Sequence, residues 1–237
     1  MMRLSLILFL FLSSVQLFAQ EGSTRFGLQY KPIIPNRLIG TYDLDFSIDQ
    51  MEASLQQKLG HSYGMIVRYG LTDAFALETG LNYTHRRFGL NWAVPDSGYS
   101  ATDVLSIVSY ELPLRALVFI RLGEGLYMNT SLGASLTMFS SDVSVFQSIG
   151  ANEYFLQEGA YRSKVQGAFL ANVGFEYRTR DAGYFYIGSS YHLPFSPIMD
   201  IAMSYEYPNG DAARVGSLRG SYLTLDLRYF LPENKDE

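Results

Sequence analysis

The sequence predicts an all-β fold, an eight-stranded antiparallel up-and-down transmembrane β-barrel with an N-terminal signal peptide. Three observations carry this prediction. Apolar residues alternate with polar or small residues along nearly every stretch after position 20, which is the period of a β-strand. The connections between these stretches are alternately long and short. Charged side chains gather on one face of the strands, and the opposite face carries essentially none.

The first twenty residues have the composition of a secretory signal peptide. Arg3 supplies a positive charge, 4–12 is an apolar run, and a small residue stands at position 19. We expect cleavage after Ala19 or Gln20, because the apolar run is too short to anchor the chain across about 30 Å of hydrocarbon. The chain has no cysteine, which excludes disulfides and a lipid-modified cysteine. The expected domains are 1–20 (signal peptide), 21–230 (outer-membrane β-barrel) and 231–237 (short periplasmic tail).

Eight stretches alternate clearly, and most reach the 9–11 residues that a tilted membrane strand needs. In chain order, the strands are predicted at 24–30, 60–69, 74–85, 105–121, 126–138, 164–177, 183–193 and 220–230. Three connections are tight turns, at 71–73, 122–125 and 178–182. Four are long, at 31–58, 86–104, 139–163 and 194–219. The alternation places all short turns on one side, as in barrels with short periplasmic turns, long extracellular loops and periplasmic termini.

The charged rows of the strands identify the interior of the barrel. The uncharged rows suit lipid, since an arginine at the midplane of a barrel's lipid face costs about 2–4 kcal/mol. The charged rows predict a lumen charge network of Arg25, Arg68, Glu78, Glu111, Arg115, Arg121, Glu176, Arg178, Asp226 and Arg228. A secreted, soluble barrel or sandwich with its charges in water is the alternative. The segregated loop lengths, the strand lengths and the aromatic positions favour the membrane.

Aromatic residues fall near the strand ends, as expected of two girdles at the membrane boundaries. Those beside the short turns are Tyr69, Phe75, Tyr127, Tyr177, Phe185 and Tyr229. Those toward the long connections are Tyr30, Tyr63, Tyr83, Tyr110, Phe139 and Tyr191.

Eight strands enclose a space that side chains nearly fill. Arginines and carboxylates inside it are expected to pair across the lumen, because an unpaired buried charge is costly. We therefore predict a plugged lumen. A narrow ion or small-solute path lined by arginine is the alternative.

Segments Phe26–Pro32, Ser109–Arg115 and Tyr222–Phe230 carry a resemblance to known proteins. The chain resembles the outer-membrane β-barrel proteins of the Bacteroidetes, which are related in architecture to small OmpA-like and OmpX-like barrels. The resemblance implies no shared catalytic residues. It implies a final strand that the barrel-assembly machinery reads, here Tyr222, Leu223, Leu225, Leu227, Tyr229 and Phe230. The chain departs from the usual pattern because residues follow the terminal aromatic.

The candidate catalytic and metal-binding residues are histidines, a serine and carboxylates near the long connections. Ser190 and His192 share one strand face near a long connection, and Asp200 or Glu206 could approach to complete a Ser-His-acid arrangement. This is the basis of a lipid-modifying enzyme as an alternative function. The first long connection is acidic, with Asp43, Asp45, Asp49 and Glu52, but it lacks the glycine and terminal glutamate of an EF-hand loop. A solvated loop is favoured, and Ile48–Leu59 could form an amphipathic helix.

The function expected is that of a structural or interaction protein acting through its four long extracellular loops, with no enzymatic activity, metal or cofactor. Loops on a rigid barrel are where recognition usually resides. Their exposed-looking apolar residues are Ile33, Ile34, Leu38, Ile39, Trp92, Val94, Tyr99, Val145, Phe146, Tyr154, Phe155, Ile198, Met199 and Tyr207. Expected partners are outer-membrane lipids, lipopolysaccharide and a surface or membrane protein. The net charge of −5 gives nucleic acid no electrostatic support.

Overall fold

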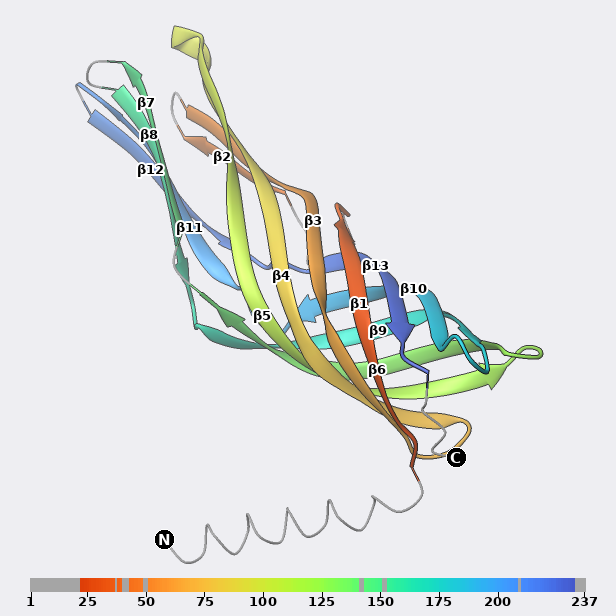
Figure 1. Cartoon of the computed structure of the whole chain (residues 1–237). Coiled ribbons are helices and arrows are strands. Elements are labelled where there is room, and N and C mark those ends of the chain that lie inside the picture. The colour runs from red at the N-terminus through yellow and green to blue at the C-terminus, as the bar shows by residue number, and fades with distance from the viewer. Residues whose placement is uncertain are drawn as a thin grey trace, which may run out of the picture.

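A computed structural model describes residues 22–36, 38–39, 43–48, 51–140, 143–150, 153–208 and 210–232. The predicted signal peptide and residues 233–237 of the predicted tail lie outside this part of the chain, so both stay predictions. Nearly all described residues belong to antiparallel strands arranged in two sheets (Figure 1). Among them, no helix has the length and apolar content needed to cross a membrane.

Eight strands close into a barrel, which confirms the predicted fold class. Its strands are β1 (Thr24–Ile34), β3 (Met51–Gly70), β4 (Phe75–Val94), β5 (Tyr99–Arg121), β6 (Leu126–Phe139), β9 (Val165–Arg178), β10 (Tyr184–Pro194) and β13 (Tyr222–Phe230). Each pairs antiparallel with its neighbours around the ring. β1 closes the ring, since Leu28 pairs with Met65 of β3 on one side and with Tyr229 of β13 on the other.

Three short turns lie at one end of the barrel, together with the start of β1 and the end of β13 (Figure 1). We call this the turn end. Gly125 and Gly183 have φ of +72° and +80°, a left-handed conformation that favours glycine. A Cβ on Gly183 would also lie 2.2 Å from the Phe230 carbonyl oxygen. These glycines allow the tight returns that the sequence predicted.

Within the described residues, the four long connections are mostly strand, so the predicted loops are built largely of paired β-structure. They continue β3, β4 and β5 far beyond the barrel and add further strands, namely β2 (Leu44–Ile48), β7 (Val143–Gly150), β8 (Glu153–Tyr161), β11 (Met199–Tyr207) and β12 (Gly210–Leu218). A short 3-10 helix, η1 (Pro95–Ser97), joins β4 to β5. The proposed helix over Ile48–Leu59 is wrong, because β3 begins at Met51 and buries every second residue, Met51, Ala53 and Leu55.

The added strands build a second layered unit at the end opposite the turns, which we call the hairpin sandwich. One layer is β2 with the far halves of β3, β4 and β5, and the other is the sheet β12-β11-β8-β7 (Figure 1). The Trp92 and Phe155 rings stack between the layers, with centroids 5.5 Å apart. The buried core is Phe46, Met51, Ala53, Leu55, Phe88, Leu90, Trp92, Val94, Leu105, Ile107, Phe139, Phe155, Ile198, Met199, Ile201, Met203, Tyr205 and Leu218.

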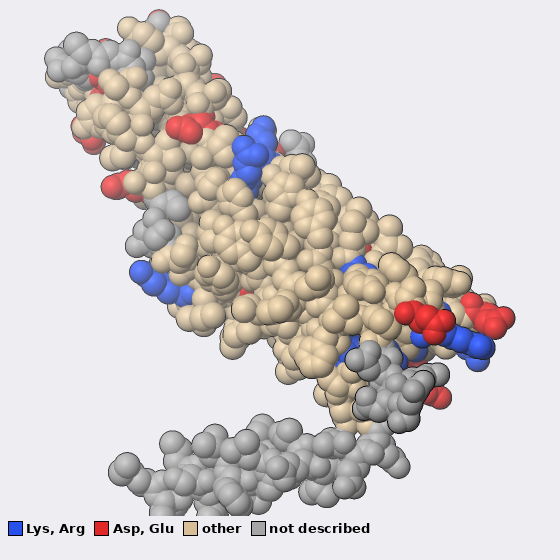
Figure 2. Space-filling view, viewed as in Figure 1, with Lys and Arg blue, Asp and Glu red and all other residues tan. Residues whose placement is uncertain are grey.

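The outer wall of the barrel is an uncharged belt. Within the strands its outward rows, at 24–34, 61–69, 75–85, 108–120, 126–138, 165–177, 185–193 and 223–229, are fully described and carry no Asp, Glu, Lys or Arg. Leu114 and Met65, for example, are 61% and 60% exposed. Figure 2 shows this broad uncharged surface between charged groups at the turn end and at the hairpin sandwich.

Candidate functional site

The lumen holds charged side chains that converge on Glu78 of β4. The Glu78 carboxylate accepts hydrogen bonds from Arg68 Nε at 3.1 Å, from Arg68 Nη2 at 3.0 Å and from Arg228 Nη1 at 3.0 Å. Arg115 Nη2 lies 2.6 Å from the same carboxylate. All four side chains are buried. They meet because period-two alternation turns one row of each strand inward.

Two further carboxylates balance these arginines. Glu176 of β9 accepts hydrogen bonds from Arg68 Nη1 at 2.5 Å and from Arg178 Nε at 2.8 Å. Asp226 of β13 accepts from Arg228 Nη2 at 2.5 Å and lies 3.8 Å from Lys31 Nζ. Charges from β1, β3, β4, β5, β9 and β13 thus form one connected set. We call it the lumen network, comprising Lys31, Arg68, Glu78, Arg115, Glu176, Arg178, Asp226 and Arg228.

A second polar group lies closer to the hairpin sandwich. Tyr222 donates its hydroxyl to Glu111 at 2.5 Å, and the His192 ring stacks on the Tyr222 ring with centroids 4.5 Å apart. His192 Nε2 lies 3.2 Å from Ser135 Oγ and 4.0 Å from Glu111. These four residues, with Arg86, form what we call the upper lumen cluster.

Arg86 marks the border between the lumen and the core of the hairpin sandwich. Its Nη1 donates to the Gly220 carbonyl at 2.6 Å, and its guanidinium lies 5.3 Å from the Tyr222 ring centroid and 6.0 Å from that of Phe139. Its Nε has no hydrogen-bond partner among the described residues. The buried guanidinium of Arg86 therefore lies at the lumen side of the hairpin-sandwich core.

The structure brings most of the predicted network residues together, with three exceptions. Glu111 lies in the upper lumen cluster, where it accepts a hydrogen bond from Tyr222. Arg25 is half-buried at the turn end, 4.1 Å from the Tyr184 ring centroid. Arg121 lies outside the network, which corrects its predicted place: it is the last residue of β5, it is exposed, and its Nε donates to the Gly123 carbonyl at 3.3 Å. The row parity placed it inward, but the strand end extends past the wall.

Sequence reasoning missed Lys31 and Arg86. Both continue an inward row by one step beyond the predicted strand ends at 30 and 85. Extending the alternation to its last matching residue would have found both.

The proposed Ser-His-acid arrangement is not assembled. Ser190 donates to Asp226 at 2.5 Å inside the lumen, while Glu206 accepts from Tyr154 in the hairpin sandwich. Asp200 pairs there with Arg162, whose Nη2 lies 3.0 Å away, and hydrogen bonds from Arg162 and Ser217 lower the pKa of Asp200. The strands β11 and β10 that carry these residues diverge into different units, so neither acid reaches His192.

The acidic first connection shows no metal-binding arrangement within the described residues. No group of three or more histidine or acidic side chains gathers anywhere in that part of the chain. Asp45 and Glu52 lie on β2 and β3, and Asp49 lies outside the described residues.

Many apolar residues assigned to the loop surface are interior, which corrects that interpretation. Ile33, Trp92, Val94, Phe155, Ile198 and Met199 are buried. Others remain exposed, and these are Ile34, Leu38, Ile39, Tyr99 and Phe146. The outer face of the β12-β11-β8-β7 sheet also carries a groove of about 500 Å³, lined by Ser144, Glu158, Gly159, Ala160, Asp200, Ala202 and Val215. This groove therefore lies on paired strands.

The final strand β13 shows the two-sided character expected of it. Tyr222 and Phe230 face the lumen and are buried, whereas Leu223, Leu225, Leu227 and Tyr229 face outward. Its register with β1 and β10 completes the ring. Its reading by an assembly machinery stays a prediction.

Comparison with solved structures supports the architecture. The outer membrane protein OprG from Pseudomonas aeruginosa matches 90% of this chain and 98% of its own, with 12% sequence identity and a TM-score of 0.50. This chain has the fold of outer-membrane β-barrel proteins. The N-terminal β-barrel domain of Pseudomonas aeruginosa OprF also matches, with 89% and 100% coverage, 13% identity and a TM-score of 0.37. Ail of Yersinia pestis matches with 90% and 100% coverage, 10% identity and a TM-score of 0.36. No protein-family model and no curated protein sequence matches.

Proposed function

We propose that this protein resides in a bacterial outer membrane and acts as a structural or interaction protein through its hairpin sandwich. The uncharged belt supports the location, because lipid accepts no charge on the outer wall of a barrel. The hairpin sandwich is then extracellular and the termini are periplasmic, as in barrels with short periplasmic turns. The resemblance to the outer-membrane barrels of the Bacteroidetes agrees with this location. Membership of that family stays a prediction.

The observation that carries the proposed role is the division of the molecule into a filled barrel and a packed sandwich. The lumen network joins strands across the barrel through buried ion pairs, which leaves the middle of the molecule occupied. The sandwich has its own apolar core, so it presents a defined surface. Catalysis plays no part in this proposal, and no cofactor is needed. Membrane lipids, lipopolysaccharide and a surface or membrane protein are the proposed partners.

A narrow channel is the second candidate function. Several buried polar atoms in the lumen have no hydrogen-bond partner among the described residues, including Gln29 Oε1, Asn129 Oδ1 and His192 Nδ1. Such atoms are satisfied by water in a hydrated path, since unpaired buried polar groups are costly.

Conductance distinguishes the two candidates. We expect the protein to fractionate with outer membranes, to change its gel migration on heating, and to give no regular current steps in a planar bilayer. Regular steps whose size changes in an Arg86→Gln variant would establish the channel instead. Recovery of the folded protein from the soluble periplasm would contradict the membrane location itself.

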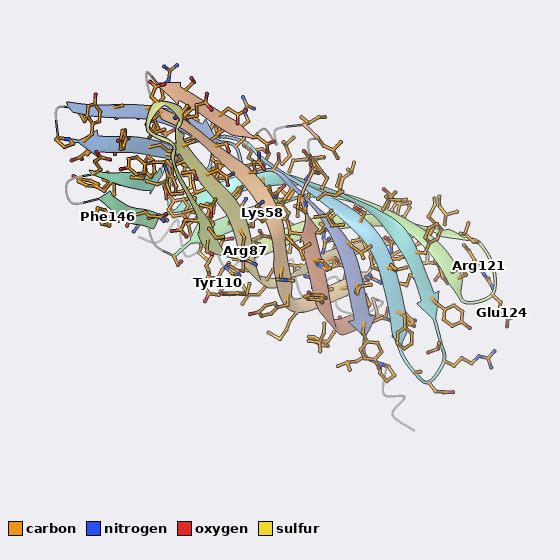
Figure 3. The ribbon with its side chains drawn as sticks, turned by 90° about the horizontal axis from the view of Figure 1, so that it is seen from above. Lys58, Arg87, Tyr110, Arg121, Glu124 and Phe146 are labelled. Carbon is orange, nitrogen blue, oxygen red and sulfur yellow. The ribbon has the colours of Figure 1, made fainter. Side chains whose placement is uncertain are left out.

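The interaction role predicts contacts at the exposed tip of the sandwich. Phe146 is 63% exposed on β7 and points away from the body of the molecule (Figure 3). A photo-reactive residue at position 146, in intact cells, is expected to cross-link to a defined macromolecule, whereas the same residue at Leu114 on the belt cross-links to lipid. Identical product patterns from the two positions would argue against the role.

A further inference from the structure

Two cations stand opposite each other just beyond the uncharged belt. Lys58 of β3 and Arg87 of β4 are cross-strand partners, and both are exposed on the outer face. Figure 3 shows them side by side on the two long strands. The aliphatic part of the Lys58 side chain packs over Gly89, because a Cβ at Gly89 would lie 2.4 Å from Lys58 Cε.

This pair is electrostatically unfavourable as it stands. Cβ atoms of directly opposed residues lie about 4.5–5.5 Å apart, and like charges at that spacing destabilise the strand pair. Among the residues that the structure describes, neither cation takes part in an ion pair. The exposed Arg121 at the turn end differs, because its cross-strand partner is Tyr127 and not a second cation. An anion from outside the chain would relieve the repulsion between Lys58 and Arg87.

The surroundings indicate where that anion comes from. Below the pair, at the edge of the belt, Tyr63 and Tyr83 pair across β3 and β4 with ring centroids 5.1 Å apart, and Tyr110 lies 5.7 Å beyond Tyr83. Such a tyrosine row is typical of the boundary between hydrocarbon and headgroups. Arg87 is four residues farther along the strand, or roughly 13 Å before strand tilt is taken into account. Lys58 and Arg87 therefore lie at headgroup height if the protein is in a membrane.

We propose that Lys58 and Arg87 bind the phosphate group of an anionic membrane lipid at this border of the belt. The proposal rests on the membrane location proposed above. A guanidinium presents a planar fork of N–H donors that fits phosphate oxygens, and an ammonium adds a point charge. The His61 and His85 side chains, also cross-strand partners, lie between the cations and the tyrosine row.

Lipid retention tests the site. The protein is reconstituted in phosphatidylcholine nanodiscs with a minor share of phosphatidic acid, released, and weighed with its bound lipid by native mass spectrometry. Wild type is expected to retain phosphatidic acid over phosphatidylcholine. The Lys58→Gln/Arg87→Gln variant should lose this preference by about tenfold or more, as for one lost charge-assisted hydrogen bond. Arg121→Gln is the matched control and should retain it. Equal retention by the double variant and wild type would overturn the proposal.

Two further measurements separate the other outcomes. Inorganic phosphate added to protein in zwitterionic micelles is expected to leave the urea midpoint unchanged, and a shift that disappears in the double variant would assign the site to free phosphate instead. In the same micelles the double variant should be at least as stable as wild type, because the repulsion is removed. Heat-modifiable migration of each variant checks folding. Failure of outer-membrane fractionation would refute the proposed location without reference to lipid preference.

Discussion

Replacing Glu78 with glutamine is expected to lower the free energy of unfolding of the barrel by about 3–5 kcal/mol, the loss found when one partner of a buried ion pair is removed. Arg68, Arg115 and Arg228 all contact this carboxylate, and the amide leaves their positive charges uncompensated in the lumen. The change in unfolding free energy is measured by urea unfolding in detergent, with the heat-modifiable gel shift as the readout of the folded fraction.

The control for this experiment is Glu124→Gln, an exposed turn residue at the end of the same barrel. It should leave the unfolding midpoint unchanged, because surface charges contribute little. A Glu78→Gln protein as stable as the Glu124→Gln protein would mean that the lumen network does not hold the barrel together. The proposal of a plugged lumen would then lose its energetic basis.

Replacing Trp92 with alanine is expected to open the hairpin sandwich while the barrel stays folded. Trp92 is 1% exposed and stacks on Phe155, so its removal leaves a cavity between the two layers. Truncating a buried tryptophan to alanine costs about 3–5 kcal/mol. Limited proteolysis should cut the hairpins of the variant rapidly, and the heat-modifiable shift of the barrel should persist.

Asn91→Ala is the matched control, since Asn91 neighbours Trp92 on β4 but is exposed on the opposite face. It should be cleaved at the wild-type rate. Trp92→Phe retains part of the stack and should fall between the two. Hairpins that resist protease equally in all three variants would contradict a core centred on Trp92.

The barrel could be predicted from the sequence because the alternation of apolar and polar residues is a local pattern along each strand. Alternation along β5 assigns Leu112 and Leu114 to one face and Glu111 and Arg115 to the other, and this needs no knowledge of the partner strands. The charged row also contained the residues that meet at Glu78. Their pairing follows once the eight strands close into a barrel, because the inward rows of all strands then share one narrow lumen.

The hairpin sandwich was harder to predict from the sequence, because its strands pair with strands from other long connections. β8 pairs with β11, so that Gln157 opposes Met203, although they belong to different long segments. The alternation of Met199, Ile201, Met203 and Tyr205 was present in the sequence. It identifies a buried face only when the opposite layer, here Trp92 and its neighbours, is known to cover it.

The strand period, the uncharged outer rows and the inward charges could be predicted from the amino-acid order, because they depend only on side-chain parity along each strand. Which apolar residues of the long connections are buried, and which arginines pair with carboxylates, became clear only from the folded arrangement. Arg115 lies inside the wall and reaches Glu78, whereas Arg121 lies on the same row but at the strand end and bonds its own turn. The reason is physical: burial and ion pairing depend on what lies across a space of a few ångströms, and residues far apart in the chain supply it.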